Sequence, residues 1–173
     1  MRPASGVAIE VLALVLVLGP ALVVPSGIPL ALYIVLVQLL ATYLIHCPAH
    51  YVVGSVVGIR FRAIRLGKST LTKILPRRLA VLASSLPVIT LSTEKSSLAR
   101  ASSREVAAMY ASGTVASVGA AIVIAAAATA IEAPAYSVLA WGVALLYLFF
   151  DALFSPRSGD LARARGAAKM MSS

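Results

Sequence analysis

The two histidines of this 173-residue chain, His46 and His50, stand four residues apart in a stretch without charged side chains. On a helix this spacing places both imidazoles on one face, one turn apart, where two nitrogens can share one tetrahedral metal ion. An ionisable side chain in an apolar segment is costly to bury and is therefore a candidate functional residue. The pair predicts a metal site; the alternative is that both rings only hydrogen-bond to neighbouring backbone carbonyls.

Asp151 is the acidic residue that we expect at the depth of the histidines. His46 lies 18 residues after Ile28, and Asp151 lies 17 residues after Pro134. These separations correspond to about 27 Å and about 25 Å of helix. Because both helices are expected to start from the same membrane face, the carboxylate and the imidazoles reach a similar level. Two histidines and one carboxylate form a catalytic zinc shell that leaves a fourth position for water.

The composition indicates an integral membrane protein with a single domain, residues 1–173. Apolar residues make up 60% of the chain and charged residues 12%, and the mean hydropathy is +0.95, whereas soluble domains carry about 25% charged residues. This excludes an ordinary soluble domain, a disordered tail and a nucleic-acid-binding domain, despite the net charge of +9. The single cysteine, Cys47, excludes an intrachain disulfide. The absence of asparagine follows a tendency of thermophilic proteins.

Long uncharged stretches predict an all-α polytopic membrane protein with four transmembrane helices. The predicted spans cover residues 7–24, 28–57, 105–131 and 134–154. Four spans place all 15 basic residues on one side of the membrane, because ten lie in the region 60–104, four in the tail 157–173, and one is Arg2. The positive-inside bias identifies that side as the cytoplasm, with both termini. We therefore expect a multi-pass protein of the cell membrane whose basic face meets anionic lipid.

The cytoplasmic region 60–104 is expected to contain a small strand or re-entrant region. Residues 58–64 alternate between apolar and polar side chains, which is the period of a half-buried strand. Residues 79–91 form an interrupted apolar stretch with some strand character after Pro87. Ser102 and Glu105 have the spacing of a capping box and predict the start of the third span. Acidic residues at the ends of the spans are expected to reach water: Glu10, Glu132 and Asp160.

Several motifs, taken in order, resemble the site-2-protease family of intramembrane zinc metalloproteases. Residues 46–61 read HCPAHYVVGSVVGIRF, similar to the H-E-x-x-H helix of that family and the Gly–aliphatic–Arg strand that follows it. Residues 86–88, 104–117 and 151–160 are similar to its proline-containing strand, its next span and its N-x-x-P…D-G motif. The resemblance covers roughly residues 28–165 and implies a zinc site with His46 and His50. Motif order favours Asp160 as the third ligand, whereas membrane depth favours Asp151.

The chain departs from the family pattern at the position that matters most for proteolysis. The glutamate that acts as the general base in the family corresponds to Cys47 here. Asp151 stands where the family has asparagine, Thr114 where it has proline, and Gly159-Asp160 reverses its D-G. A thiol in apolar surroundings is a poor base at neutral pH. Losing a general base lowers hydrolysis by about 10²–10⁴-fold.

These departures predict a non-proteolytic homologue that acts as a membrane binding or assembly module, either with a retained metal or with the fold alone. Its expected partner, besides the lipid bilayer, is a transmembrane or cytoplasmic polypeptide or a second copy of the chain, and no nucleic acid. One alternative is an active metal-dependent hydrolase in which Glu105 or Asp151 replaces the missing base. Another is a structural subunit of a membrane complex with no site at all.

Overall fold

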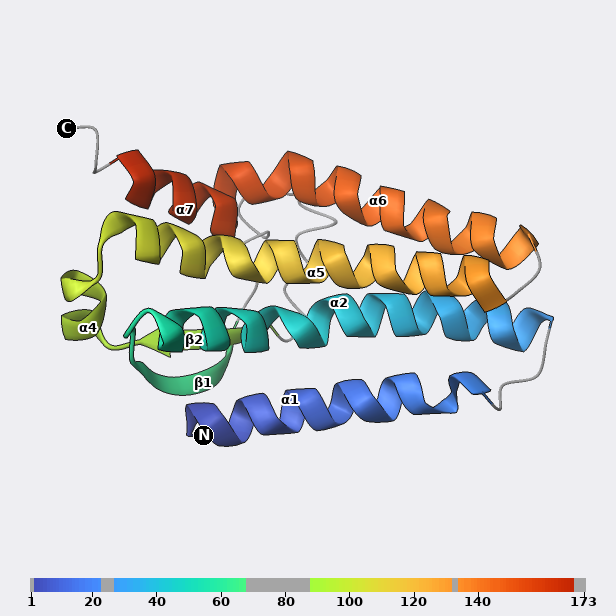
Figure 1. Ribbon diagram of the computed structural model, residues 1–173, viewed down its shortest axis with the longest axis horizontal. Coiled ribbons are helices and arrows are strands. Elements are labelled where there is room, and N and C mark those ends of the chain that lie inside the picture. Colours follow the sequence, from blue (N-terminus) through green and yellow to red (C-terminus); the bar gives the residue numbers. More distant parts are fainter. Residues whose placement is uncertain (1, 23–26, 68–87, 132–133, 170–173) are drawn as a thin grey trace.

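The computed structural model describes residues 2–22, 27–67, 88–131 and 134–169, which form a bundle of long helices with a small sheet at one end (Figure 1). The elements are α1 (Pro3–Leu18), η1 (Gly19–Leu22, a 3₁₀ turn), α2 (Ile28–Val56), β1 (Phe61–Gly67), β2 (Val88–Thr93), α4 (Lys95–Arg100), α5 (Ser103–Ile131), α6 (Pro134–Ser158) and α7 (Asp160–Lys169). The start of α1 and the end of α7 lie at the end of the bundle that carries the sheet (Figure 1).

Among the described residues, three helices are long and apolar enough to cross a membrane. They cover Ile28–Val56, Ser103–Ala130 and Ala135–Arg157, with 29, 28 and 23 residues. By length and composition, these helices match three of the four predicted spans and support a membrane protein. The first predicted span corresponds to α1, an apolar helix of 16 residues, followed by η1 with four. The count of four spans therefore stays a prediction.

Small residues allow the three long helices to pack closely. The buried cluster joins Leu30 and Ile34 of α2 to alanines of α5 and α6: Ala121, Ala125, Ala128, Ala140 and Ala144. Small side chains let helix backbones approach, and van der Waals packing then holds the bundle in lipid. Gln38 adds a polar link, because its Nε2 donates to the carbonyl oxygens of Ala121 (2.9 Å) and Ala140 (3.1 Å). One buried side chain thus connects all three helices.

The predicted strands form a two-stranded antiparallel sheet. β1 pairs with β2 in a register that sets Ile64 opposite Leu91, with an irregularity between Phe61 and Ala63. The first strand begins at Phe61 rather than at residue 58, because Gly58 adopts a φ of +79° in the turn that ends α2. Residues 79–87 of the predicted re-entrant stretch lie outside the described residues.

The start of α5 confirms the predicted capping box. The backbone N–H of Ser102 donates to Glu105 Oε2 at 2.6 Å, and the N–H of Glu105 points to Ser102 Oγ at 3.4 Å. The two residues therefore satisfy backbone donors that the first turn of a helix leaves without partners. Glu105 is half-buried at this position.

Glu10 contradicts the expectation that it is solvated at a span end. The first helix begins at Pro3, so Glu10 lies two turns inside α1, where its relative exposure is 5%. Because α1 packs against α2, a buried side chain of α1 faces the bundle. Within the described part of the chain, Oε2 of Glu10 has no hydrogen-bond partner. Glu132 lies outside the described residues.

Candidate metal centre

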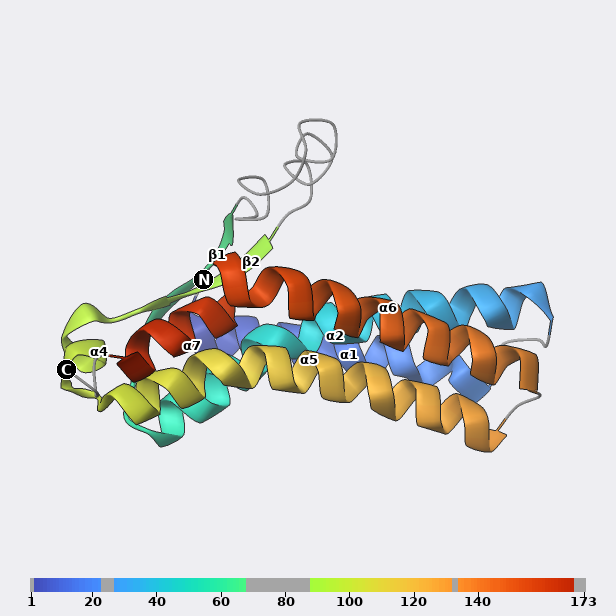
Figure 2. The ribbon, with the colours of Figure 1, turned by 90° about the horizontal axis from the view of Figure 1, so that it is seen from above.

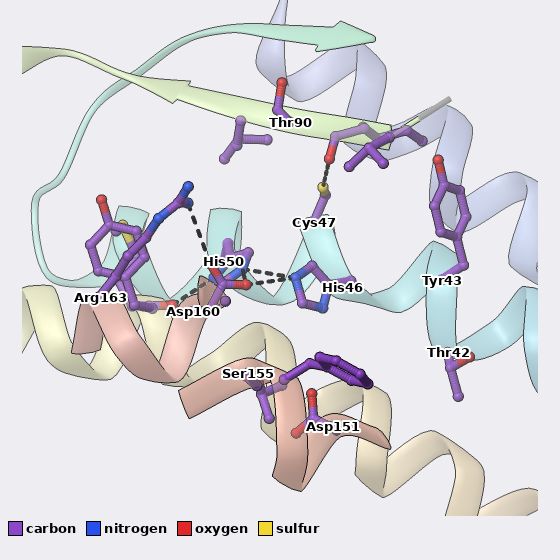
Figure 3. Close-up of a pocket in the computed structure, with 18 of the residues that line it drawn as sticks. Thr42, Tyr43, His46, Cys47, His50, Thr90, Asp151, Ser155, Asp160 and Arg163 are labelled. Atoms are coloured by element: carbon purple, nitrogen blue, oxygen red, sulfur yellow. Dashed lines mark hydrogen bonds and ion pairs between the residues drawn. The ribbon is translucent and has the colours of Figure 1, made fainter. Parts of the chain in front are cut away.

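Two elements far apart in the sequence bring the candidate ligands together. His46 and His50 project from one face of α2, as their spacing predicts, and Asp160 is the first residue of α7 (Figure 3). The chain breaks at Gly159, so that α7 is displaced from the axis of α6 and lies along α5 (Figures 1 and 2). This displacement carries the Asp160 carboxylate to the two imidazoles.

His46, His50 and Asp160 are called the trio below. The distances between their ligand atoms match the edges of a metal coordination shell. Oδ2 of Asp160 lies 2.9 Å from Nε2 of His46 and 3.1 Å from Nε2 of His50, and the two nitrogens are 3.2 Å apart. Ligand atoms about 2.0–2.1 Å from a tetrahedral zinc ion lie roughly 3.3 Å from one another. The imidazole planes are nearly perpendicular, at 88°. The three atoms can therefore bind one ion while the rings stay apart.

Hydrogen bonds on the far side of each ring fix which nitrogen faces the trio. Nδ1 of His50 lies 2.6 Å from the carbonyl oxygen of Met109, which can only accept, so this Nδ1 carries the proton. Nδ1 of His46 lies 3.1 Å from Ser117 Oγ, and that hydroxyl donates to the carbonyl of Thr42 at 2.7 Å. The Ser117 oxygen then accepts a hydrogen bond from the Nδ1–H group of His46. Both Nε2 atoms consequently present lone pairs to the trio.

The resulting arrangement requires positive charge at its centre. Two lone pairs separated by 3.2 Å face each other beside a carboxylate oxygen. Such a set repels itself unless a metal ion or added protons lie between the atoms. Nδ1–H bonds to a hydroxyl and a backbone carbonyl are the outer contacts that orient metal-binding histidines. The donor set of two nitrogens and one carboxylate oxygen fits zinc.

Asp160 is ionised in this setting. Burial opposes the charge of its carboxyl group. When added protons rather than a metal lie between the atoms, hydrogen bonds from the protonated His46 and His50 and their positive charge outweigh that effect. The pKa of Asp160 therefore lies below its usual range. A carboxylate ligand binds a metal in its ionised form, so this residue is ready to bind at neutral pH.

Of the two candidate third ligands, the trio contains Asp160 and leaves out Asp151. Asp151 lines the same cavity from α6, on the other side of the histidines from β2 (Figure 3). The prediction of Asp151 from membrane depth assumes that α6 is the last helix near the histidines. The break at Gly159 brings in a further helix, and the order of the motifs, rather than depth, indicated the residue that reaches the histidines.

A cavity of about 690 Å³ adjoins the trio. Its walls come from α2, β2, α5, α6 and α7, and they are mainly apolar. Cys47 belongs to the wall, and its Sγ donates to the carbonyl oxygen of Ile89 in β2 at 3.5 Å, away from the trio (Figure 3). Glu105, one proposed substitute for the missing base, is bound to Ser102 and is not part of this wall. Of Glu105 and Asp151, Asp151 is therefore the better placed to act as the base.

Searches against protein-family models, curated proteins and solved structures find no match to this chain. The resemblance to site-2 proteases therefore stays a prediction from the motifs.

The residues of α5 that support the histidines are not among those predicted from the sequence. Ser117 and the carbonyl of Met109 orient the rings, and Gly113 lies directly against them, since a Cβ there would be 2.3 Å from His50 Nε2. Other small residues of this helix pack against the neighbouring helices, which conceals the two that support the site. Gly113 and Ser117 have the same four-residue spacing as the histidines, and that shared spacing is a signal that could have identified them.

We expect Ser117→Ala to weaken zinc binding by about 10–100-fold, the usual cost of removing an outer contact of a metal-binding histidine. Without the hydroxyl oxygen of Ser117, His46 loses the acceptor that holds the imidazole proton on Nδ1. Chelator competition on the purified protein measures the effect, and Thr129→Ala, a hydroxyl deletion farther along α5, serves as the control. Equal zinc affinities in the Ser117 variant and the wild type would contradict this assignment of the tautomer.

Proposed function

We propose that this chain is a membrane-embedded zinc-binding protein, similar to the site-2 proteases, that binds a partner polypeptide without cutting it. One observation carries the proposal: the Nε2 atoms of His46 and His50 and a carboxylate oxygen of Asp160 converge within hydrogen-bonding distance of one another. The mainly apolar cavity beside them supplies a place for the partner.

The arrangement in the membrane follows from the lengths of the helices and from the charges. α1 and η1 together reach about 32 Å, using 1.5 Å per residue for the α-helix and 2.0 Å for the 3₁₀ turn, which matches the hydrocarbon core of a bilayer. We propose that α1 is the fourth span and that both termini lie in the cytoplasm. The basic residues of region 60–104 and of the tail then meet the anionic leaflet.

Zinc held by three protein ligands offers a fourth position, where it polarises a bound carbonyl or water. His46 and His50 hold the ion through nitrogens whose orientation α5 fixes, and Asp160 offsets part of its charge. Cys47 occupies the position of the family's general base, and its thiol points to β2. We infer that the chain keeps the capacity to bind a polypeptide near the metal and has lost the group that makes hydrolysis fast.

Elemental analysis of the full chain in detergent tests the metal. We expect one zinc ion per wild-type chain, and a content well below one in Asp160→Ala, because a ligand is gone. Asp151→Ala is the matched control: it removes an aspartate from the same cavity and is expected to retain the ion. Wild-type protein that takes up no zinc when the metal is supplied would refute the proposal.

An active metal-dependent hydrolase is the second candidate, and the position of Asp151 in the cavity wall favours it. In that case Asp151 takes the role of the base. Cleavage of a generic transmembrane substrate by the wild type, abolished in His46→Ala and in Asp151→Asn, would support the hydrolase over the binding module.

A further inference from the structure

Arg163 gives the cavity beside the trio a single permanent positive charge. Among the described residues that line this cavity there is no other arginine and no lysine. The side chain rises from α7 toward β2, into the space above the trio (Figure 3). The hydrogen bonds that orient the two histidines do not involve it.

The contacts of Arg163 leave most of its hydrogen-bonding capacity available. Its Cζ lies 5.7 Å from the centre of the Tyr110 ring, which supports the guanidinium by a cation–π contact. In the described part of the chain its one polar contact is Nη1 to Asp160 Oδ1, at a long 3.5 Å. A guanidinium carries five N–H donors arranged to bind a carboxylate through two bonds. The side chain is thus held in place but incompletely paired.

The chemistry of the cavity defines the ligand that it fits. The walls are mainly apolar, and the cationic group lies at one end, next to the metal trio. An apolar chain that ends in a carboxylate complements both features, since its tail contacts the walls and its charge meets Arg163. We propose that the cavity binds the carboxyl terminus of a partner polypeptide, with the terminal carboxylate paired to Arg163.

The free edge of β2 favours a polypeptide over a fatty acid as the source of this carboxylate. β2 pairs with β1 on one side, and the described residues provide no strand on its other side. Several residues of β2 line the cavity, and because the carbonyl of Ile89 accepts from Cys47 Sγ, an added strand would bond to other backbone groups of β2. A fatty acid offers nothing that bonds to such an edge. This inference deepens the proposed function and rests on it for the identity of the partner.

Calorimetric titration of the zinc-supplied full chain in detergent tests the inference. The probes are an acetylated six-residue peptide of alanine, leucine and valine with a free carboxyl terminus, the same peptide as its terminal amide, and palmitate. We expect the acid to bind at least about tenfold more tightly than the amide, because a charged hydrogen-bonded pair is lost in the amide. We expect Arg163→Gln to remove this preference and Arg165→Gln, a neighbouring exposed arginine of α7, to retain it.

Each other outcome overturns the inference. Equal binding of acid and amide, or a preference that survives in Arg163→Gln, shows that Arg163 does not recognise the terminus. Arg163-dependent binding of palmitate without binding of the peptide assigns the cavity to a lipid. Zinc content measured on the same samples separates this test from the proposed function. Wild-type protein without zinc refutes the proposed metal centre. Loss of zinc in Arg163→Gln alone means that Arg163 supports Asp160 instead of binding a terminus.

Discussion

Replacing Cys47 by glutamate is expected to raise peptide hydrolysis by about 10²–10⁴-fold over the wild-type chain, the usual contribution of a general base. The wild-type site has the convergent ligand set but lacks a basic group at the residue next to His46. Cys47 lines a cavity of about 690 Å³, so a longer side chain has room to extend into it. The variant restores the residue that the H-E-x-x-H helix uses to activate water.

Cys47→Gln is the matched control, because it has the shape of glutamate without the base. Cleavage of a transmembrane substrate in detergent is the measurement, with zinc content determined on each preparation. The gain is expected in Cys47→Glu alone and is expected to vanish when His46→Ala is added. If the glutamate and glutamine variants cleave equally slowly while both retain zinc, the resemblance to site-2 proteases does not extend to the mechanism.

The sequence predicted those features that depend on local patterns. Uncharged apolar runs indicated the long helices, because the cost of burying charge in lipid leaves few other interpretations. Alternation of side chains indicated the first strand, and an apolar stretch with strand character after Pro87 indicated the second. The spacing of Ser102 and Glu105 indicated the start of α5. The four-residue spacing of His46 and His50 placed both rings on one face. Each of these signals lies within a few consecutive residues.

The features that the sequence did not predict depend on contacts between distant segments. The position of Asp160 depends on the break at Gly159, where a Cβ would lie 2.8 Å from Cα of Ser155, and on how α7 then packs along α5. The burial of Glu10 follows from α1 starting before residue 7 and facing α2. The support that Ser117 gives to His46 joins residues 71 positions apart. Local patterns can suggest such residues, but they do not determine which distant segments come together.

Gly113→Ala tests the close contact between α5 and the histidines, and we expect it to weaken zinc binding by about 100-fold. A Cβ at this position would lie 2.3 Å from His50 Nε2 and 2.9 Å from His46 Cε1, closer than unbonded atoms approach. Both rings must therefore move away from the trio, and the Nδ1 bonds that orient them are strained. Chelator competition for zinc measures the loss.

Gly119→Ala is the control, since no atom outside its immediate surroundings lies within 4 Å of a Cβ added there. Alanine favours a helix over glycine by about 1 kcal/mol, so backbone propensity alone makes both variants slightly more stable than the wild type. The metal-free stability of Gly113→Ala then shows whether the helix persists while binding is lost. Wild-type zinc affinity in this variant would mean that the histidine rings lie elsewhere, and the metal centre would lose its geometric basis.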